Sequence, residues 1–152
     1  MSGTAEQPVA ADGPLRGPPL NWSDMNASIT KREAVAAVSA AFNLSLANAT
    51  THFANVNASK SVWWFDIPVE KFTSGQYEVL DLLLVNSDAS SIHHLRVPTA
   101  YVRDNLAKFH IREDKGSVSL ELSSLASRMF QDIRPGSERL SFSKFLVNTL
   151  PL

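Results

Sequence analysis

Residues 61–67 constrain the fold more than any other part of the chain, because they run S-V-W-W-F-D-I and are closed by Pro68. Aromatic and β-branched residues that alternate with a period of two are typical of a β-strand. Trp63 and Trp64 are consecutive, so they point to opposite faces of this strand. Both faces of the sheet therefore need at least partial cover.

The composition is that of one folded domain. The chain has 152 residues, of which 44% are hydrophobic and 19% are charged. A chain of this length buries enough surface to fold without a metal or a disulfide. The absence of cysteine excludes disulfides, zinc–thiolate sites and a cysteine nucleophile. The 14 basic and 15 acidic residues give a net charge of −1, without the basic excess that is usual in dedicated nucleic-acid binders.

Prolines and glycines divide the chain into two parts. Residues 1–20 hold four of the eight prolines and three of the six glycines, with no apolar periodicity. We therefore predict a flexible tail over residues 1–28 and a single α+β domain over residues 29–152. The first thirty residues contain no apolar signal core, and no apolar stretch is long enough to span a bilayer. We expect a cytoplasmic protein with no membrane contact.

Two helices are predicted at the start of the domain. Thr30 and Glu33 form a capping box, so the first helix should cover residues 31–42, with Asn43 ending it. Ser45 suits the cap of a second helix that would run to Asn57. These segments predict an N-terminal helix pair.

Three strands follow, over residues 61–67, 77–85 and 90–97. Their short connections, including a turn at residues 86–89, predict an antiparallel three-strand meander. Thr99 suits the cap of a short helix, and two further strands are expected at 109–112 and 118–122, the second half-exposed because apolar and polar residues alternate in it. The predicted fold is α+β, with the helix pair packed on the meander, followed by the helix and the two further strands. Residues 141–149 fit either a helix or a strand.

This order of elements across residues 31–112 resembles the core of the restriction-endonuclease-like nucleases. In that family, an acidic residue on the second strand and an acidic-x-Lys triplet on the third hold a divalent metal that activates water. Here the second strand offers Glu78 and Asp81, whereas His94 and Arg96 occupy the ends of the triplet. The resemblance therefore implies a degenerate nuclease-like domain.

Motifs for catalysis are absent from the chain. It has no phosphate-binding glycine loop, zinc-protease motif, nucleophile elbow or EF-hand loop. We therefore predict no catalytic residue, no cofactor and no metal site. Were the protein an enzyme, its acids would be the carboxylates of the meander, Asp66, Glu78 and Asp81.

The first functional hypothesis is a non-catalytic regulatory or accessory protein that contacts nucleic acid. Residues 90–116 hold five basic and three acidic residues, a local charge of +2, together with three histidines. A basic strand-helix region of this kind, beside the helix pair, suits phosphate and base contacts. The predicted nucleic-acid-binding residues are Asn55, Asn57, Lys60, His94, Arg96, Arg103, Lys108 and Arg112.

The alternative is a protein-interaction module or homodimer that uses an aromatic sheet face. Trp63 and Trp64 are the predicted partner-binding residues, because one of them must lie on the face away from the helices. Phe142 and Phe145 are the residues that would otherwise cover that face. The charged loop with Asp132, Arg134 and Glu138 fits either a functional loop or a solvated turn.

Overall fold

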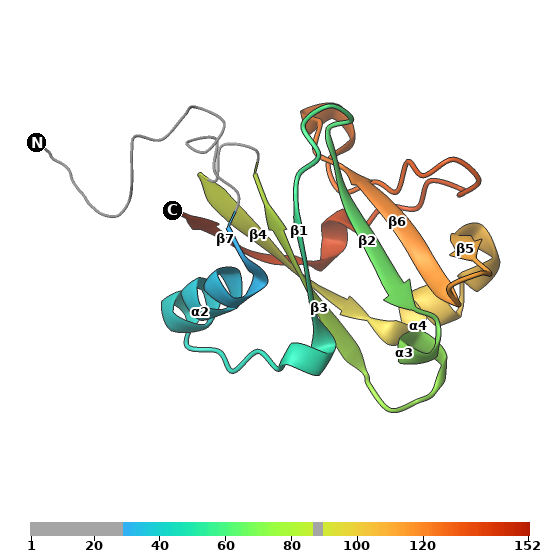
Figure 1. The fold of residues 1–152 in the computed structure, drawn as a ribbon, viewed down its shortest axis with the longest axis horizontal. Helices are drawn as coiled ribbons and strands as arrows, with labels where there is room; N and C mark the ends of the chain where they lie inside the picture. The colour runs from blue at the N-terminus through green and yellow to red at the C-terminus, as the bar shows by residue number, and fades with distance from the viewer. Residues whose placement is uncertain (1–28, 87–89) are drawn as a thin grey trace, which may run out of the picture.

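The computed structural model describes residues 29–86 and 90–152, and these form two β-sheets packed face to face (Figure 1). The predicted tail over residues 1–28 and most of the predicted turn at 86–89 lie outside the described residues. The described part contains seven strands, three α-helices and several single 3₁₀ turns. It is therefore a mixed α/β structure that is mostly sheet.

Helix α2 (Lys31–Phe42) confirms the first predicted helix. The amide of Glu33 donates to the Thr30 hydroxyl at 3.1 Å, and the amide of Thr30 donates to the Glu33 carboxylate at 2.8 Å. Asn43 ends the helix in the left-handed conformation, with φ 56°. Ala34 and Val38 on the inner face are fully buried.

The second predicted helix is wrong. After α2 the chain forms a 3₁₀ turn, η1 (Asn48–Thr50), and then strand β1 (Thr51–Asn55). β1 pairs in parallel with β3 (Val79–Val85), so hydrogen bonds to a neighbouring strand replace helical ones. Alternate side chains meet different layers, since Phe53 packs under α2 and Ala54 lies between the sheets. The spacing of apolar residues in this segment suits a helix as well as a strand, and pairing with β3 determines that it forms a strand. The predicted N-terminal helix pair therefore does not form.

The three-strand meander is wrong as well. The first sheet has the order β1-β3-β4-β7, and its further strands are β3 (Val79–Val85), β4 (Ser91–Pro98) and β7 (Leu146–Pro151). The second sheet has the order β2-β6-β5, and its strands are β2 (Val62–Pro68), β6 (Ser117–Ser123) and β5 (His110–Arg112). β2 therefore pairs with β6 and not with β3. The connection from β2 to β3, which contains helix α3 (Glu70–Thr73), carries the chain to the other sheet.

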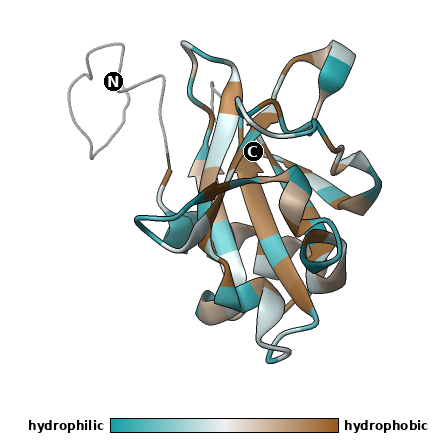
Figure 2. Cartoon of the chain, turned by 90° about the vertical axis from the view of Figure 1, so that its right-hand side faces the viewer, coloured by the Kyte–Doolittle hydropathy of each residue, from teal (hydrophilic) through white to brown (hydrophobic). Residues whose placement is uncertain are grey.

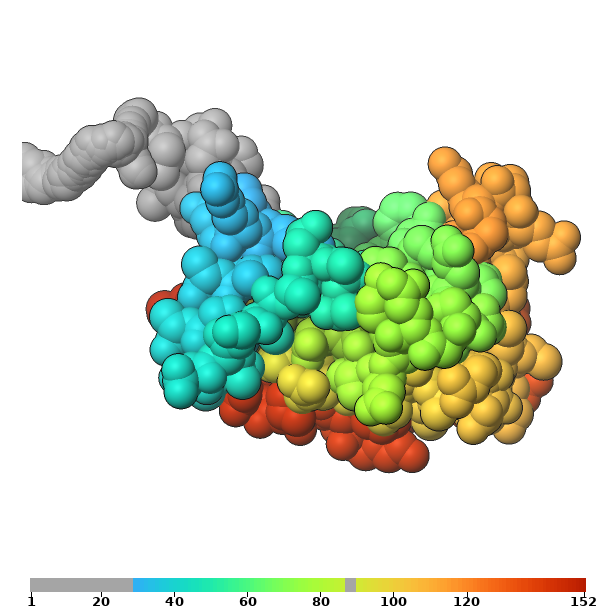
Figure 3. All heavy atoms as spheres, turned by 90° about the horizontal axis from the view of Figure 1, so that it is seen from below, coloured from blue at the N-terminus to red at the C-terminus, as the bar shows by residue number. Residues whose placement is uncertain are grey.

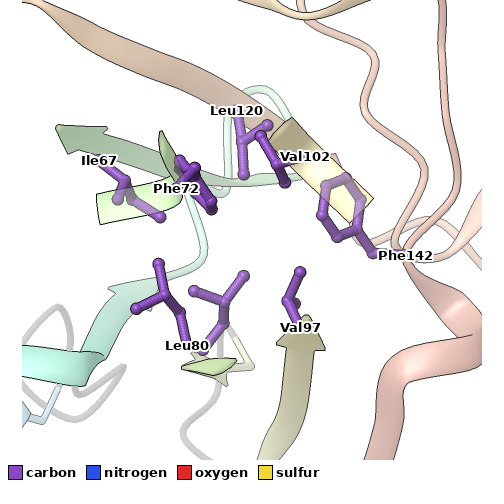
Figure 4. Close-up of a pocket in the computed structure, with 8 residues that line it drawn as sticks. Ile67, Phe72, Leu80, Val97, Val102, Leu120 and Phe142 are labelled. Atoms are coloured by element: carbon purple, nitrogen blue, oxygen red, sulfur yellow. The ribbon is translucent and has the colours of Figure 1, made fainter. Parts of the chain in front are cut away.

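The main core lies between the sheets. Inward side chains of β2, β3, β4 and β6 meet those of α3 and α4 (Thr99–Arg103), and Figure 2 shows brown segments along the strands among white and teal ones. Figure 4 shows Ile67, Leu80, Leu120 and Phe142 among the side chains that converge there, and the space between them does not admit a water molecule. Every residue of β6 is buried, so the prediction of a half-exposed strand is wrong.

A second, smaller core lies outside the first sheet. Ala34 and Val38 of α2 pack on Leu83, Val85 and Ile92.

The structure also decides the ambiguous C-terminal segment. It forms a 3₁₀ turn, η4 (Ser143–Phe145), followed by β7. Phe142 is fully buried in the core between the sheets, beside Tyr101 at 5.5 Å between ring centroids.

Candidate functional site

The two adjacent tryptophans of β2 have opposite environments. Trp63 is 0% exposed, and its indole N–H donates to the carbonyl of Val85 at 2.9 Å. Its ring also stacks on Phe130, with 5.7 Å between centroids. Trp64 is 51% exposed on the outer face of the second sheet. Of the two predicted partner-binding residues, only Trp64 is therefore accessible to a partner.

The Trp64 ring is held in place by the neighbouring strand. Its indole N–H donates to the Ser119 hydroxyl at 3.1 Å, and its backbone lies opposite Glu121 in the antiparallel register of β2 and β6. Ser119 is fully buried. An exposed ring that is fixed in this way loses little conformational freedom when a partner covers it.

Beside Trp64, Glu121 is paired with an arginine from the loop after β6. One terminal guanidinium nitrogen of Arg134 donates to the Glu121 carboxylate at 2.6 Å. Asp132 supports this pair, because one of its carboxylate oxygens accepts from the amides of Glu121 and Arg134. Burial raises the pKa of Asp132, and these two hydrogen bonds oppose that rise.

Two polar atoms of this cluster lack a hydrogen-bond partner within the described residues. They are the second carboxylate oxygen of Asp132 and the Nε of Arg134, and both are buried.

A second ion pair involves Asp66, which lies two residues after Trp64 on the same face of β2. Arg112 donates to Asp66 at 3.1 Å, and the Ser117 hydroxyl donates to the other Asp66 oxygen. The loop after Asp132 packs closely against the start of β5. Gly136 in this loop has φ 94°, and a Cβ there would lie 3.3 Å from the His110 ring. A side chain at position 136 would therefore be strained as well as crowded.

We call the surface formed by Trp64, Asp66, Arg112, Glu121 and Arg134 the Trp64 face. It carries one half-exposed indole between two ion pairs whose charges cancel. The two arginines keep 25% and 26% of their side chains exposed. Asp114 adds a further carboxylate 3.7 Å from Arg112, so the face presents an aromatic ring and guanidinium groups without excess positive charge.

The histidine and arginine predicted on β4 both lie beside Asp81 on the other sheet. His94 is 1% exposed, and its Nε2 lies 2.7 Å from Asp81. Arg96 lies 3.6 Å from the same carboxylate and keeps 45% of its side chain exposed. His94 Nδ1 and the hydroxyl of Thr51 are buried without a hydrogen-bond partner in the described part. His94 is therefore shielded from any ligand in this conformation.

The other predicted nucleic-acid-binding residues do not gather on one surface. The Asn55 side chain donates to the carbonyl of Ile29 at 3.0 Å, and Asn57 accepts from Ser59 in the turn that also holds Lys60. This turn joins β1 to β2 at the top of Figure 1, whereas α4, at whose end Arg103 lies, is at the lower right. Lys108 lies in the 3₁₀ turn η2 (Leu106–Lys108), and Arg112 belongs to the Trp64 face.

The carboxylates of the nuclease resemblance are also apart. Glu78 precedes β3, and its carbonyl accepts from Thr99, while Asp81 is closed off by His94 and Arg96. Within residues 29–86 and 90–152, no three His, Cys, Asp or Glu side chains are grouped to hold a metal ion. The meander that the resemblance required is replaced by strands of two different sheets.

A further histidine, His52, is partly buried. His52 on β1 lies 3.3 Å from the Lys71 ammonium group. Burial lowers the pKa of His52 to about 4, and the charges of Lys71 and Lys31 add to this effect. Lys31 donates to the carbonyl of Asn48 at 3.2 Å, so the η1 turn lies close to both lysines.

Sequence reasoning missed Ser119 and Glu121. Alternation in β6 places both on the outer face, but only the pairing of β6 with β2 brings them to Trp64.

The chain matches no known protein-family model, no curated protein and no solved structure. None of the helices in the described part is long and apolar enough to cross a membrane.

Proposed function

We propose that the protein is a non-catalytic interaction module that binds a polypeptide partner through the Trp64 face. The observation that carries the proposal is the 51% exposure of Trp64, whose ring is fixed by Ser119 on the outer face of the second sheet. A tryptophan of this kind is the side chain that most often dominates the free energy of protein–protein binding. The cytoplasmic location expected from the sequence is part of the same proposal.

The surroundings of Trp64 favour a polypeptide over a nucleic acid. Arg112 and Arg134 flank the ring, and arginine is enriched with tryptophan at the centres of protein interfaces. Each arginine is already paired with a carboxylate of the same chain, so the face offers no excess positive charge to phosphates.

A peptide-display selection on the purified full chain tests this proposal. We expect enriched peptides that bind in isothermal titration calorimetry, and Trp64→Ala should weaken their binding by roughly 30-fold or more, as expected for a central interface tryptophan. Val147→Ala is the matched control, because Val147 is 46% exposed but lies in the other sheet. This control should bind the peptides as the wild type does.

Two results would overturn the proposal. One is a selection that yields no binding peptide, or peptides that bind Trp64→Ala as tightly as the wild type. The other is tight binding of labelled single-stranded or duplex oligonucleotides that weakens steeply with salt, because phosphate contacts release counterions. Unchanged urea unfolding of Trp64→Ala would show that any loss of peptide binding is not a loss of fold.

A further inference from the structure

Strand β7 is an edge strand of the first sheet. It pairs with β4 on one side, from Ser91 opposite Pro151 to Leu95 opposite Leu146. On its other side it has no strand partner among the described residues. In Figure 3 the red C-terminal segments lie along the outer margin of the molecule, beyond the yellow of β4. One side of β7 thus presents backbone groups that another strand can bind.

The other edge strands are better protected. β5 has only three residues, and its Arg112 is in an ion pair. β2 ends in Pro68 and carries Asp66. β1 is covered at its end, where Asn55 exchanges two hydrogen bonds with the backbone of Ile29. Shortness, charge, proline, bulges and cover are the usual means by which edge strands avoid pairing with another chain.

β7 lacks most of these means. Residues 145–152 contain no charged side chain, and Pro151 is the last residue of the strand. Leu146, Val147 and Leu152 are 40%, 46% and 55% exposed, and they are three of the five large apolar side chains that the described part exposes. The register shift beside Leu95 leaves Val147 without an opposite residue on β4, so the strand has one bulge near its beginning. An apolar, uncharged edge of this length is a site for pairing with a second strand.

The hydrogen-bond pattern indicates the register of such pairing. The amide of Leu152 donates to the carbonyl of Ser90 at 2.8 Å, so the backbone N–H and C=O groups of Leu150 also point toward β4. Those of Thr149 point to the free side of the strand. In an antiparallel pair, directly opposite residues lie on the same face of the sheet. A two-fold axis at Asn148 therefore places Thr149 opposite Val147 of the second copy, and Leu146 opposite Leu150.

We propose that two copies of this chain form a homodimer by antiparallel pairing of their β7 strands about a two-fold axis at Asn148. The two four-stranded sheets would then continue as one sheet of eight strands, with both α2 helices on the same face. The strand suits a copy of itself, because its lack of charge leaves no like-charge repulsion across the axis. The dimer would leave both Trp64 faces open, since these lie on the other sheet.

A charge-swap experiment at Asn148 tests both the edge and the register. The proposed axis places position 148 opposite itself, so Asn148→Lys and Asn148→Asp each put like charges directly opposite. In sedimentation equilibrium the full wild-type chain should dimerise, and each variant alone should associate more weakly by roughly five-fold or more. An equal mixture of the two variants should recover dimerisation, as a heterodimer. Trp64→Ala is the control and should dimerise as the wild type does.

Several outcomes would overturn the proposal. The first is that the wild-type chain stays monomeric when its concentration is raised 100-fold. The second is that the variants dimerise as the wild type does. The third is that the mixture forms no more dimer than either variant alone. Loss of the dimer in Trp64→Ala would assign the interface to the Trp64 face instead. Circular dichroism and urea unfolding of each variant keep a folding defect distinct from a loss of pairing.

Discussion

The outer faces of the two sheets are closed in different ways. On the first sheet, α2 covers Leu83, Val85 and Ile92 with its apolar side chains. On the second sheet, Glu121 and Asp66 bind arginines, and within the described residues no helix lies over Trp64. Burial of apolar surface therefore stabilises one face, and hydrogen bonds between polar side chains stabilise the other.

This difference decides which face is available to a partner. An apolar face left open would expose a large hydrophobic patch, so it needs the helix. A polar face whose side chains bind one another needs no cover, and a single aromatic ring can stay exposed on it. The two sides of β2 show a related contrast, because Trp64 lies on the polar outer face and Trp63 lies in the apolar core between the sheets.

The largest expected effect separates these two tryptophans. Trp63→Ala should lower the free energy of unfolding by about 3–5 kcal/mol, because it empties a buried site and leaves the Val85 carbonyl without its indole donor. Trp64→Ala should change it by less than about 1 kcal/mol. Urea unfolding followed by circular dichroism measures both. Equal losses in the two variants would contradict the contrast between the buried and the exposed side of β2.

An intermediate effect tests whether the polar face is held by its ion pairs. Arg134→Met leaves the nearly buried Glu121 carboxylate without its cation, so it should cost about 1–3 kcal/mol of unfolding free energy. Arg103→Met is the control, since the pair of Arg103 with Asp104 is exposed and should contribute less than about 1 kcal/mol. Adding Glu121→Gln to Arg134→Met should recover part of the loss. A loss no greater than that of the control would show that the pair does not hold the face.

The smallest expected effect concerns His52 at the margin of the core. Its pKa is about 4 in the folded chain and near 6.5 when unfolded, so the unfolded chain binds one more proton between these values. This contribution to stability is present above pH 6.5 and is lost as the pH falls toward 4. The stability advantage of the wild type over His52→Gln should therefore shrink from pH 7 to pH 5. We expect a change of about 1 kcal/mol, since partial exposure of His52 to solvent screens the effect.

Urea unfolding of both proteins at the two pH values measures this change. The opposite shift expected from the raised pKa of Asp132 is common to both proteins and cancels in the difference. An advantage that stays constant or grows toward pH 5 would rule out a depressed His52 pKa.

Local patterns in the chain were sufficient for several elements. The capping box of Thr30 and Glu33 predicts α2 with its observed bounds, because both of its hydrogen bonds form within one helical turn. The alternation around Trp63 and Trp64 predicts a strand and the division of the two rings between its faces. The predicted strands over residues 77–85, 90–97 and 109–112 also lie where β3, β4 and β5 form.

Contacts between distant segments decided the rest. Residues 51–55 become a strand because β3 lies beside them, and Trp64 meets Glu121 because β2 pairs with β6 across 57 positions of the chain. Periodicity shows which side chains share a face, but it carries no information about which strands are neighbours. Secondary-structure preferences act over a few residues and are readable in the sequence, whereas sheet order depends on how all the apolar faces are buried together. Only the tertiary structure therefore reveals the two sheets, the open edge of β7 and the polar surroundings of Trp64.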